Sequence, residues 1–226
     1  MSKENKFLKD MTKGTPWKLL LQFAVPLFIG NIFQQLYNMV DSIIVGNFVG
    51  PNALGAIGTT NSLNFLFFSL VAGLSVGIGI IVAQFFGSNN EEKVKDTIGN
   101  AIWIVLISSV IMACIGFFIA KPVLVLLRTD KVILGDATAY LKVTSIGICC
   151  TGLYNGVSSI LRALGDSKTP LIFLIFASLV NVVLDLWFVL GLGWGVVGAG
   201  VATAFSQFLS AVHVFFMHIR AILILG

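Results

Sequence analysis

The sequence predicts an all-α membrane protein that crosses the bilayer six times. Of its 226 residues, 57% are hydrophobic and only 11% are charged, whereas a soluble domain carries roughly a quarter charged residues. The mean hydropathy of +0.98 points the same way. A hydrocarbon core of about 30 Å needs about 20 apolar residues of helix, and stretches of that kind recur along the chain.

Short segments with turn-forming residues separate these stretches. The breaks are expected at residues 50–52, 87–90, 121–122, 165–167 and 191–193. The first stretch is longer than a bilayer requires, so we expect it to tilt or to bend near Pro26. The predicted spans are Trp17–Gly46, Asn61–Phe86, Thr97–Ala120, Ala137–Leu161, Leu171–Leu190 and Val197–His218.

Lysine and arginine set the expected orientation, because they gather in the cytoplasmic connections of membrane proteins. Residues 1–16 form a basic tail without the cleavage site of a signal peptide. The connections at 87–96 and 162–169 are also basic, whereas the connection with Lys121, Arg128 and Lys131 is an exception. We therefore expect a multi-pass protein of the cell membrane (the inner or plasma membrane), with both termini cytoplasmic.

Several function classes are disfavoured. The net charge of +4 and pI of about 9.1 follow from basic residues that flank helices, so membrane lipid and not nucleic acid is the expected partner. The three cysteines lie in apolar runs without metal-binding spacing. The sequence has no phosphate-binding loop and no nucleophile paired with a base. We expect neither an enzyme nor a bound cofactor.

Two carboxylates stand out because they lie inside predicted spans, where a carboxylate is costly unless it faces a cavity or a partner. These are Asp41 and Asp185. With the N-terminus inside, both spans run outward, and each aspartate lies about five residues, or roughly 8 Å, below the outer boundary. The alternative is that each is a hydrogen-bonded structural residue. Their equal depth favours function.

Polar residues recur on helix faces near these depths. Asn181 is one turn from Asp185, and Thr203 is expected at the same depth on the sixth span. Carboxylate, amide and hydroxyl oxygens together suit a small cation, with Na⁺ the candidate metal ion, or a bound proton. Each stripe alone is equally consistent with hydrogen bonding between helices. The side chains predicted to line a polar cavity are Gln34, Asn38, Asn155, Ser158 and Gln207.

The chain resembles the multidrug and toxic compound extrusion (MATE) family. The motifs are PLFIGNIFQQLYNMVDSIIVGNFVGPNALGAIG at 26–58, AQFFGSNNEEKVK at 83–95, LRALGDSKTP at 161–170 and NVVLDLWFVLGLGWGVVGAGVATAFSQ at 181–207. The resemblance implies a transporter of twelve helices in two lobes, which exports cationic or amphipathic drugs in exchange for H⁺ or Na⁺. The family's coupling residues match Asp41, Asn181, Asp185 and Thr203.

The chain departs from this family in length. Residues 17–219 match the N-terminal six-helix lobe, and residues 220–226 match the beginning of the linker to a second lobe. We expect the lobe to pair with a second lobe or with another copy of itself. Two alternatives stay open: a lipid-linked saccharide flippase of the same superfamily, for which Arg162 is the available basic residue, and a truncated membrane subunit that does not transport.

Overall fold

The computed structural model describes the backbone of residues 15–225 and the side chains of residue 15 and residues 17–213. Six of its helices are long and apolar enough to cross a membrane, which confirms the predicted fold class. The helices are α1 (Pro16–Phe48), α2 (Pro51–Gly87), α3 (Glu91–Leu126), α4 (Lys131–Ala163), α5 (Lys168–Asp185) and α6 (Gly195–Leu225), with a π-helical segment, η1 (Leu186–Gly191), between α5 and α6.

Local chemistry explains most helix boundaries. Pro51 starts α2 directly after Gly50, whose φ of 117° suits glycine. The side chain of Asn90 accepts a hydrogen bond from the backbone N–H of Lys93 and caps α3. Asp130 caps α4 through the N–H of Val132 in the same way.

Several predicted boundaries were wrong, among them the starts of α3 (Glu91, expected at Thr97) and of α4 (Lys131, expected at Ala137). Helix α3 does not break at Lys121-Pro122 but continues through Pro122 to Leu126. Only one backbone hydrogen bond is lost at a proline, and an otherwise apolar helix in a bilayer tolerates that loss. The second span also begins ten residues earlier than expected, at Pro51 and not Asn61.

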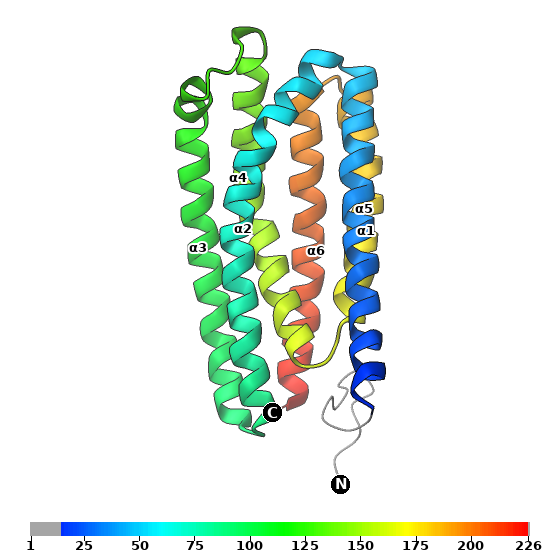
Figure 1. Ribbon diagram of the computed structural model, residues 1–226, viewed down its shortest axis with the longest axis vertical. Coiled ribbons are helices and arrows are strands. Elements are labelled where there is room, and N and C mark those ends of the chain that lie inside the picture. Colours follow the sequence, from blue (N-terminus) through cyan, green and yellow to red (C-terminus); the bar gives the residue numbers. More distant parts are fainter. Residues whose placement is uncertain (1–14, 226) are drawn as a thin grey trace.

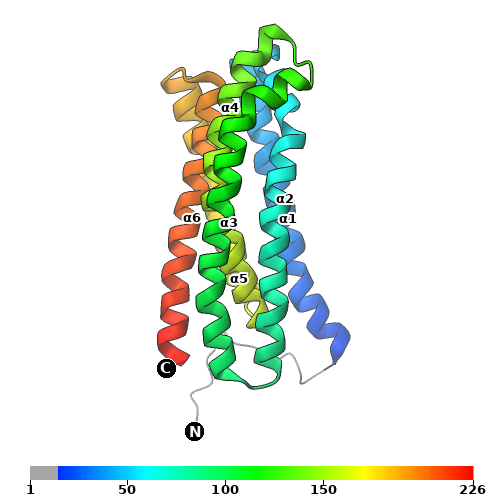
Figure 2. The same ribbon diagram turned by 90° about the vertical axis from the view of Figure 1, so that its left-hand side faces the viewer.

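The helices stand side by side as a single bundle (Figure 1). Helix α4 packs against α2, α3 and α6, while α1 packs chiefly against α5. Figures 1 and 2 show the start of α1 and the end of α6 at one end of the bundle, together with the α2–α3 and α4–α5 connections. The other three connections lie at the opposite end.

Small residues bring α3 and α4 close together. A side chain at Gly152 would collide with Ser109 of α3, and a Cβ at Gly116 would lie 2.5 Å from the hydroxyl of Ser145. Close approach of this kind is how helices associate in lipid. By contrast, Gly73 and Gly77 of α2 have no atom within 4 Å of an added Cβ, so they serve no packing inside this lobe.

The outer surface of the bundle is apolar. Large hydrophobic side chains such as Phe118 (74% exposed) and Trp103 (63% exposed) point away from the bundle on α3. Water does not favour such a surface, whereas lipid does. The chain is therefore a multi-pass membrane protein.

Candidate functional site

The structure brings the two intramembrane aspartates together. Asp41 projects from α1 and is 6% exposed, while Asp185 is the last residue of α5 and is fully buried. The two carboxylates lie close enough to interact electrostatically. The two aspartates, which the sequence analysis expects at equal depth, therefore form one shared site in the interior of the bundle.

A hydrogen-bonded pair of neutral polar side chains joins α5 to α6 one turn from Asp185. Asn181 is 1% exposed and lies one turn before Asp185. Its side-chain Nδ2 donates a hydrogen bond to Oγ1 of Thr203 on α6 over 3.4 Å. The amide oxygen of Asn181 takes no part in this hydrogen bond and has no other partner within the described part of the chain. We refer to Asp41, Asn181, Asp185 and Thr203 as the aspartate cluster.

The aspartate cluster holds four buried oxygen atoms without a hydrogen-bond partner: Oδ1 of Asp41, Oδ1 of Asn181, and both carboxylate oxygens of Asp185. Buried polar atoms are nearly always paired, so an unpaired group needs a reason. Burying a carboxylate without a partner is costly unless the group is neutralised. A bound cation or a proton would supply that neutralisation.

Two tyrosines that the sequence analysis did not select lie beside the aspartates. Tyr140 of α4 interacts electrostatically with both Asp41 and Asp185. Tyr37 interacts with Asp41 and lies one turn before it on α1. The four-residue spacing of Tyr37 from Asp41 was a usable signal. The position of Tyr140 depends on how α4 packs and left no signal in the sequence.

An apolar cluster closes the site toward the end of the bundle that carries the α1–α2 connection. It is built one turn beyond the aspartates, from Ile44 and Val45 of α1 and Val189 of η1, together with Ala53, Ile57, Tyr140, Val196 and Ala199. The π-helix that provides Val189 begins immediately after Asp185. Such segments occur frequently at functional sites.

A polar cavity of about 260 Å³ lies on the other side of the aspartate cluster. Three predicted residues, Gln34, Asn155 and Gln207, line it. Gln34 precedes Asp41 on α1, which begins at the end of the bundle near the chain termini, and Gln207 follows Thr203 on α6, which runs back toward that end, so the cavity lies on the side of the chain termini. Tyr37 interacts with Gln34, Gln207 and Asp41 and thus stands between the cavity and the cluster.

The other two predicted cavity residues lie elsewhere. Asn38 is exposed on the surface of the bundle, where its Nδ2 donates to Oε1 of Gln35 over 3.5 Å. Ser158 is buried in α4, and its hydroxyl has no hydrogen-bond partner. In the sequence, Asn38 lies one turn from Gln34, and Ser158 lies one turn from Asn155, and both Gln34 and Asn155 line the cavity. The rotation of each helix within the bundle, which the pattern does not specify, decides the difference.

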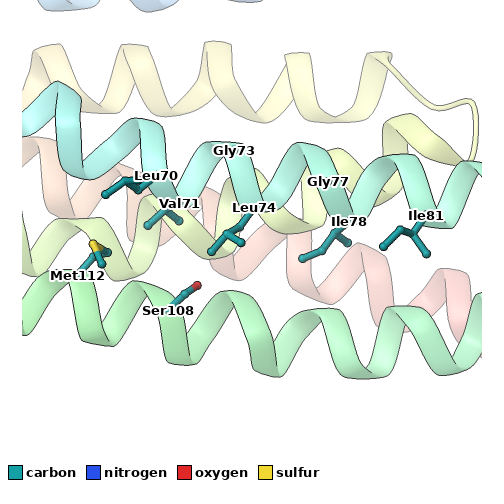
Figure 3. A pocket seen from close by; sticks show the side chains of 9 residues that line it. All are labelled: Leu70, Val71, Gly73, Leu74, Gly77, Ile78, Ile81, Ser108 and Met112. Atoms are coloured by element: carbon teal, nitrogen blue, oxygen red, sulfur yellow. The ribbon is translucent and has the colours of Figure 1, made fainter.

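A larger apolar groove of about 550 Å³ runs between α2 and α3 (Figure 3). Side chains of both helices point into it, including Leu74 and Ile78 from α2 and Met112 from α3. Ser108 is its only hydroxyl, and it contains no charged residue. Its chemistry is that of a lipid-facing surface, so the smaller polar cavity is the better candidate for a binding site.

One intramembrane cation was also not weighed in the sequence analysis. Lys142 lies within the span formed by α4, and its Nζ is 4.9 Å from the ring centroid of Phe117 on α3. This cation–π contact stabilises the charge away from the aspartate cluster. We assign it to the interface between α3 and α4.

Comparison with known proteins gives matches over most of the chain. The family model described as MatE matches residues 26–187. A probable multidrug resistance protein from Bacillus subtilis, YpnP, is 34% identical over 88% of this chain and 44% of its own length. A second one from the same organism, YoeA, is 29% identical over 91% of this chain and 45% of its own length.

Solved structures match over the same extent. The structure described as the outward-facing conformation of a multidrug resistance MATE family transporter aligns with a TM-score of 0.89 and 27% identity. The match covers 95% of this chain and 47% of that one. The chain therefore spans about half the length of the relatives it matches, as the predicted single lobe requires.

Proposed function

The chain belongs to the MATE family and corresponds to its N-terminal lobe, and on that premise we propose that it is half of a secondary active transporter. The complete transporter would export cationic or amphipathic compounds in exchange for H⁺ or Na⁺. The family consists of transporters and not enzymes, which agrees with the expectation from the sequence.

The unpaired oxygen atoms of the aspartate cluster support the coupling role. Asp41 and Asp185 bring two carboxylates together in a site that α1, α5 and α6 shield from solvent. Na⁺ favours hard oxygen ligands of this kind, and a proton would neutralise one carboxylate directly. In either case the ion removes the cost of burying like charges side by side. Binding is therefore sensitive to the net charge of the pair.

The route to the cluster follows from the order of residues along α1. The polar cavity reaches Gln34, Tyr37 stands one turn further, and Asp41 follows. The apolar cluster around Val45 closes the opposite side. In this conformation the coupling ion would approach from the cavity, on the side of the chain termini.

A second lobe is needed to complete the transport path. Asn38 and Gln35 of α1 are exposed on the bundle surface, where among the described residues they bond only to each other over 3.5 Å, and contact of such amide groups with lipid is unfavourable. A second six-helix lobe, or another copy of this chain, would cover this face. The helical backbone of α6 continues through 220–225, the segment predicted to begin the linker between lobes.

Replacing each aspartate by asparagine tests the coupling role, because asparagine keeps the size and removes the charge. If the coupling ion is Na⁺, Asp41→Asn and Asp185→Asn should each lower the Na⁺ affinity of the purified chain by at least about tenfold. If it is H⁺, each variant should abolish the proton release that accompanies ligand binding. In a complete transporter that carries this lobe, either variant should abolish ion-driven efflux. The double variant should cost little more than either single one, because both act on the same site.

Efflux in everted membrane vesicles and a thermal unfolding profile should be measured together. Asp136→Asn is the matched control, because Asp136 is exposed at the start of α4 and lies outside the cluster. Wild-type ion binding and wild-type efflux in both single variants would show that Asp41 and Asp185 are structural residues.

A further inference from the structure

Arg162 is the one charged residue among those that line the polar cavity. It lies in the last turn of α4 and is half-buried. Its Nη2 donates a hydrogen bond to Oγ of Ser159 over 2.9 Å. A guanidinium carries five N–H donors, and no carboxylate within residues 15–213 forms an ion pair with it. Most of its N–H donors therefore have no side-chain or backbone partner among the residues that the structure describes, and Arg162 belongs to the wall of the cavity.

Asp166, the carboxylate closest to Arg162 in the sequence, bonds to the backbone of α5 and not to Arg162. Oδ1 of Asp166 accepts hydrogen bonds from the backbone N–H groups of Lys168 and Thr169, each over 3.0 Å, and so caps α5. Asp41 and Asp185 belong to the aspartate cluster and do not line the cavity. The charge of Arg162 is thus uncompensated, and burial of an unpaired charge is costly.

The rest of the cavity wall supplies neutral donors. The amide of Asn31 lines it and can donate to an anionic oxygen, whereas the amides of Gln34 and Gln207 also line it but contact Tyr37. The hydroxyl of Tyr154 donates to the carbonyl of Pro170 over 2.9 Å and fixes α5 against α4 beside Arg162. The cavity volume of about 260 Å³ is just below the range for drug-sized ligands. It suits a compact headgroup.

We propose that Arg162, with Asn31 in the same cavity wall, forms a binding site for a phosphate group. A guanidinium pairs with phosphate oxygens through two parallel hydrogen bonds. The last turn of α4 lies beside the α4–α5 connection, toward the end of the bundle that holds the chain termini (Figure 1), and the ends of membrane spans lie near the lipid headgroups. The phosphate comes either from an anionic lipid or from a soluble phosphate ester. The site does not depend on the cation coupling of the aspartate cluster.

Lipid retention by the purified chain tests the proposal. The chain in detergent is mixed with equal amounts of phosphatidylglycerol and digalactosyldiacylglycerol, which carries no phosphate, and bound lipid is counted by native mass spectrometry. Thermal unfolding is measured in parallel with inorganic phosphate and with chloride at equal ionic strength. We expect wild type to retain phosphatidylglycerol about tenfold better than the galactolipid, because charge-assisted hydrogen bonds select the phosphate.

Arg162→Gln should lower that retention about tenfold, and Arg162→Lys should restore part of it because lysine keeps the charge without the planar fork. Lys168→Gln is the matched control: it is exposed, basic, six residues away, and not in the cavity wall. It should change retention less than twofold. If phosphate ion stabilises wild type but not Arg162→Gln, and neither lipid is preferred, the site is upheld with a soluble phosphate ester as its ligand.

Two outcomes overturn the proposal. One is an equal loss of lipid in Arg162→Gln and Lys168→Gln, which would reflect general surface charge. The other is wild-type chain that retains both lipids equally and is stabilised equally by both anions. This second comparison needs no variant, so it decides the question even if Arg162→Gln does not fold.

Discussion

At the scale of single residues, buried hydroxyls that bond to their own helix contrast with the buried oxygen atoms of the aspartate cluster. Several hydroxyls bond to their own helix and need no partner from another one. Ser75 donates to the carbonyl of Val71, and Ser145 donates to that of Leu141. Polar stripes of such residues are compatible with an ordinary helix interface. The aspartate cluster differs, because its oxygen atoms are acceptors that no neighbouring donor satisfies.

Thr203 provides a test of whether a hydroxyl oxygen belongs to the ion site. Thr203→Ala removes Oγ1 and with it the hydrogen bond from Asn181. We expect Na⁺ affinity to fall about fivefold, because one neutral oxygen contact contributes about 1 kcal/mol. Equilibrium binding of radioactive sodium to purified chain measures the change.

Thr203→Ser is the control for this experiment, since it keeps the hydroxyl and removes only a methyl group. It should bind Na⁺ within about twofold of wild type. Unchanged sodium binding in Thr203→Ala would exclude the hydroxyl from the ion's ligands and leave the carboxylates and Asn181 to hold the ion.

At the scale of helices, close packing between α3 and α4 holds one side of the bundle in place. Gly152 meets Ser109, and Gly156 would bring an added Cβ within 3.0 Å of Val105. An interhelical hydrogen bond from Oγ1 of Thr144 to Oδ1 of Asn64 (2.9 Å) ties α4 to α2. Helix α4 is thereby fixed on several sides, which positions Tyr140 beside the aspartates.

Gly152→Ala tests this packing. The added methyl group would collide with Ser109 and lie 2.9 Å from a methyl carbon of Val71, so we expect a loss of about 1–3 kcal/mol in stability. Thermal unfolding in detergent measures it. Gly99→Ala is the matched control on α3, because an added Cβ there has no atom within 4 Å.

The pair Ser109→Gly with Gly152→Ala should recover part of the lost stability, since it removes the Ser109 atoms that the new methyl group meets and leaves only the contact with Val71. An unfolding temperature of Gly152→Ala equal to that of Gly99→Ala would contradict the close approach of the two helices.

At the scale of the whole molecule, the two ends of the bundle differ in charge. The end that carries the first turn of α1 also carries Lys93, Lys95, Arg162 and Lys168 on its connections. The opposite end carries Lys121, Arg128 and Lys131. The positive-inside rule favours the first end as the cytoplasmic one. The bundle places these connections together, and the side of the membrane they face stays a prediction.

Cysteine labelling in intact cells tests the orientation. In a background where the three native cysteines are replaced by serine, Asn52→Cys should react with a membrane-impermeant maleimide, and Ser88→Cys should react only after the cells are opened. Both positions are exposed and lie at opposite ends of α2. The reverse pattern of labelling would place both termini outside.

The sequence by itself determined the number of spans, the identity of the intramembrane carboxylates and the family. These depend on hydropathy summed over about 20 residues and on motifs contiguous in the chain, both of which are local properties. The periodicity of a helix also places Asn181 one turn from Asp185 without knowledge of any neighbour.

Only the tertiary structure decided which side chains meet. Periodicity fixes how residues are spaced around one helix but not how that helix is rotated against its neighbours, which packing determines. For this reason Asn38 lies outside the bundle while Gln34 lines the cavity, and Tyr140 reaches the aspartates from another helix. Arg162 belongs to the same class: its charge is evident in the sequence, but its place in the cavity wall follows from the packing of α4 among the other helices.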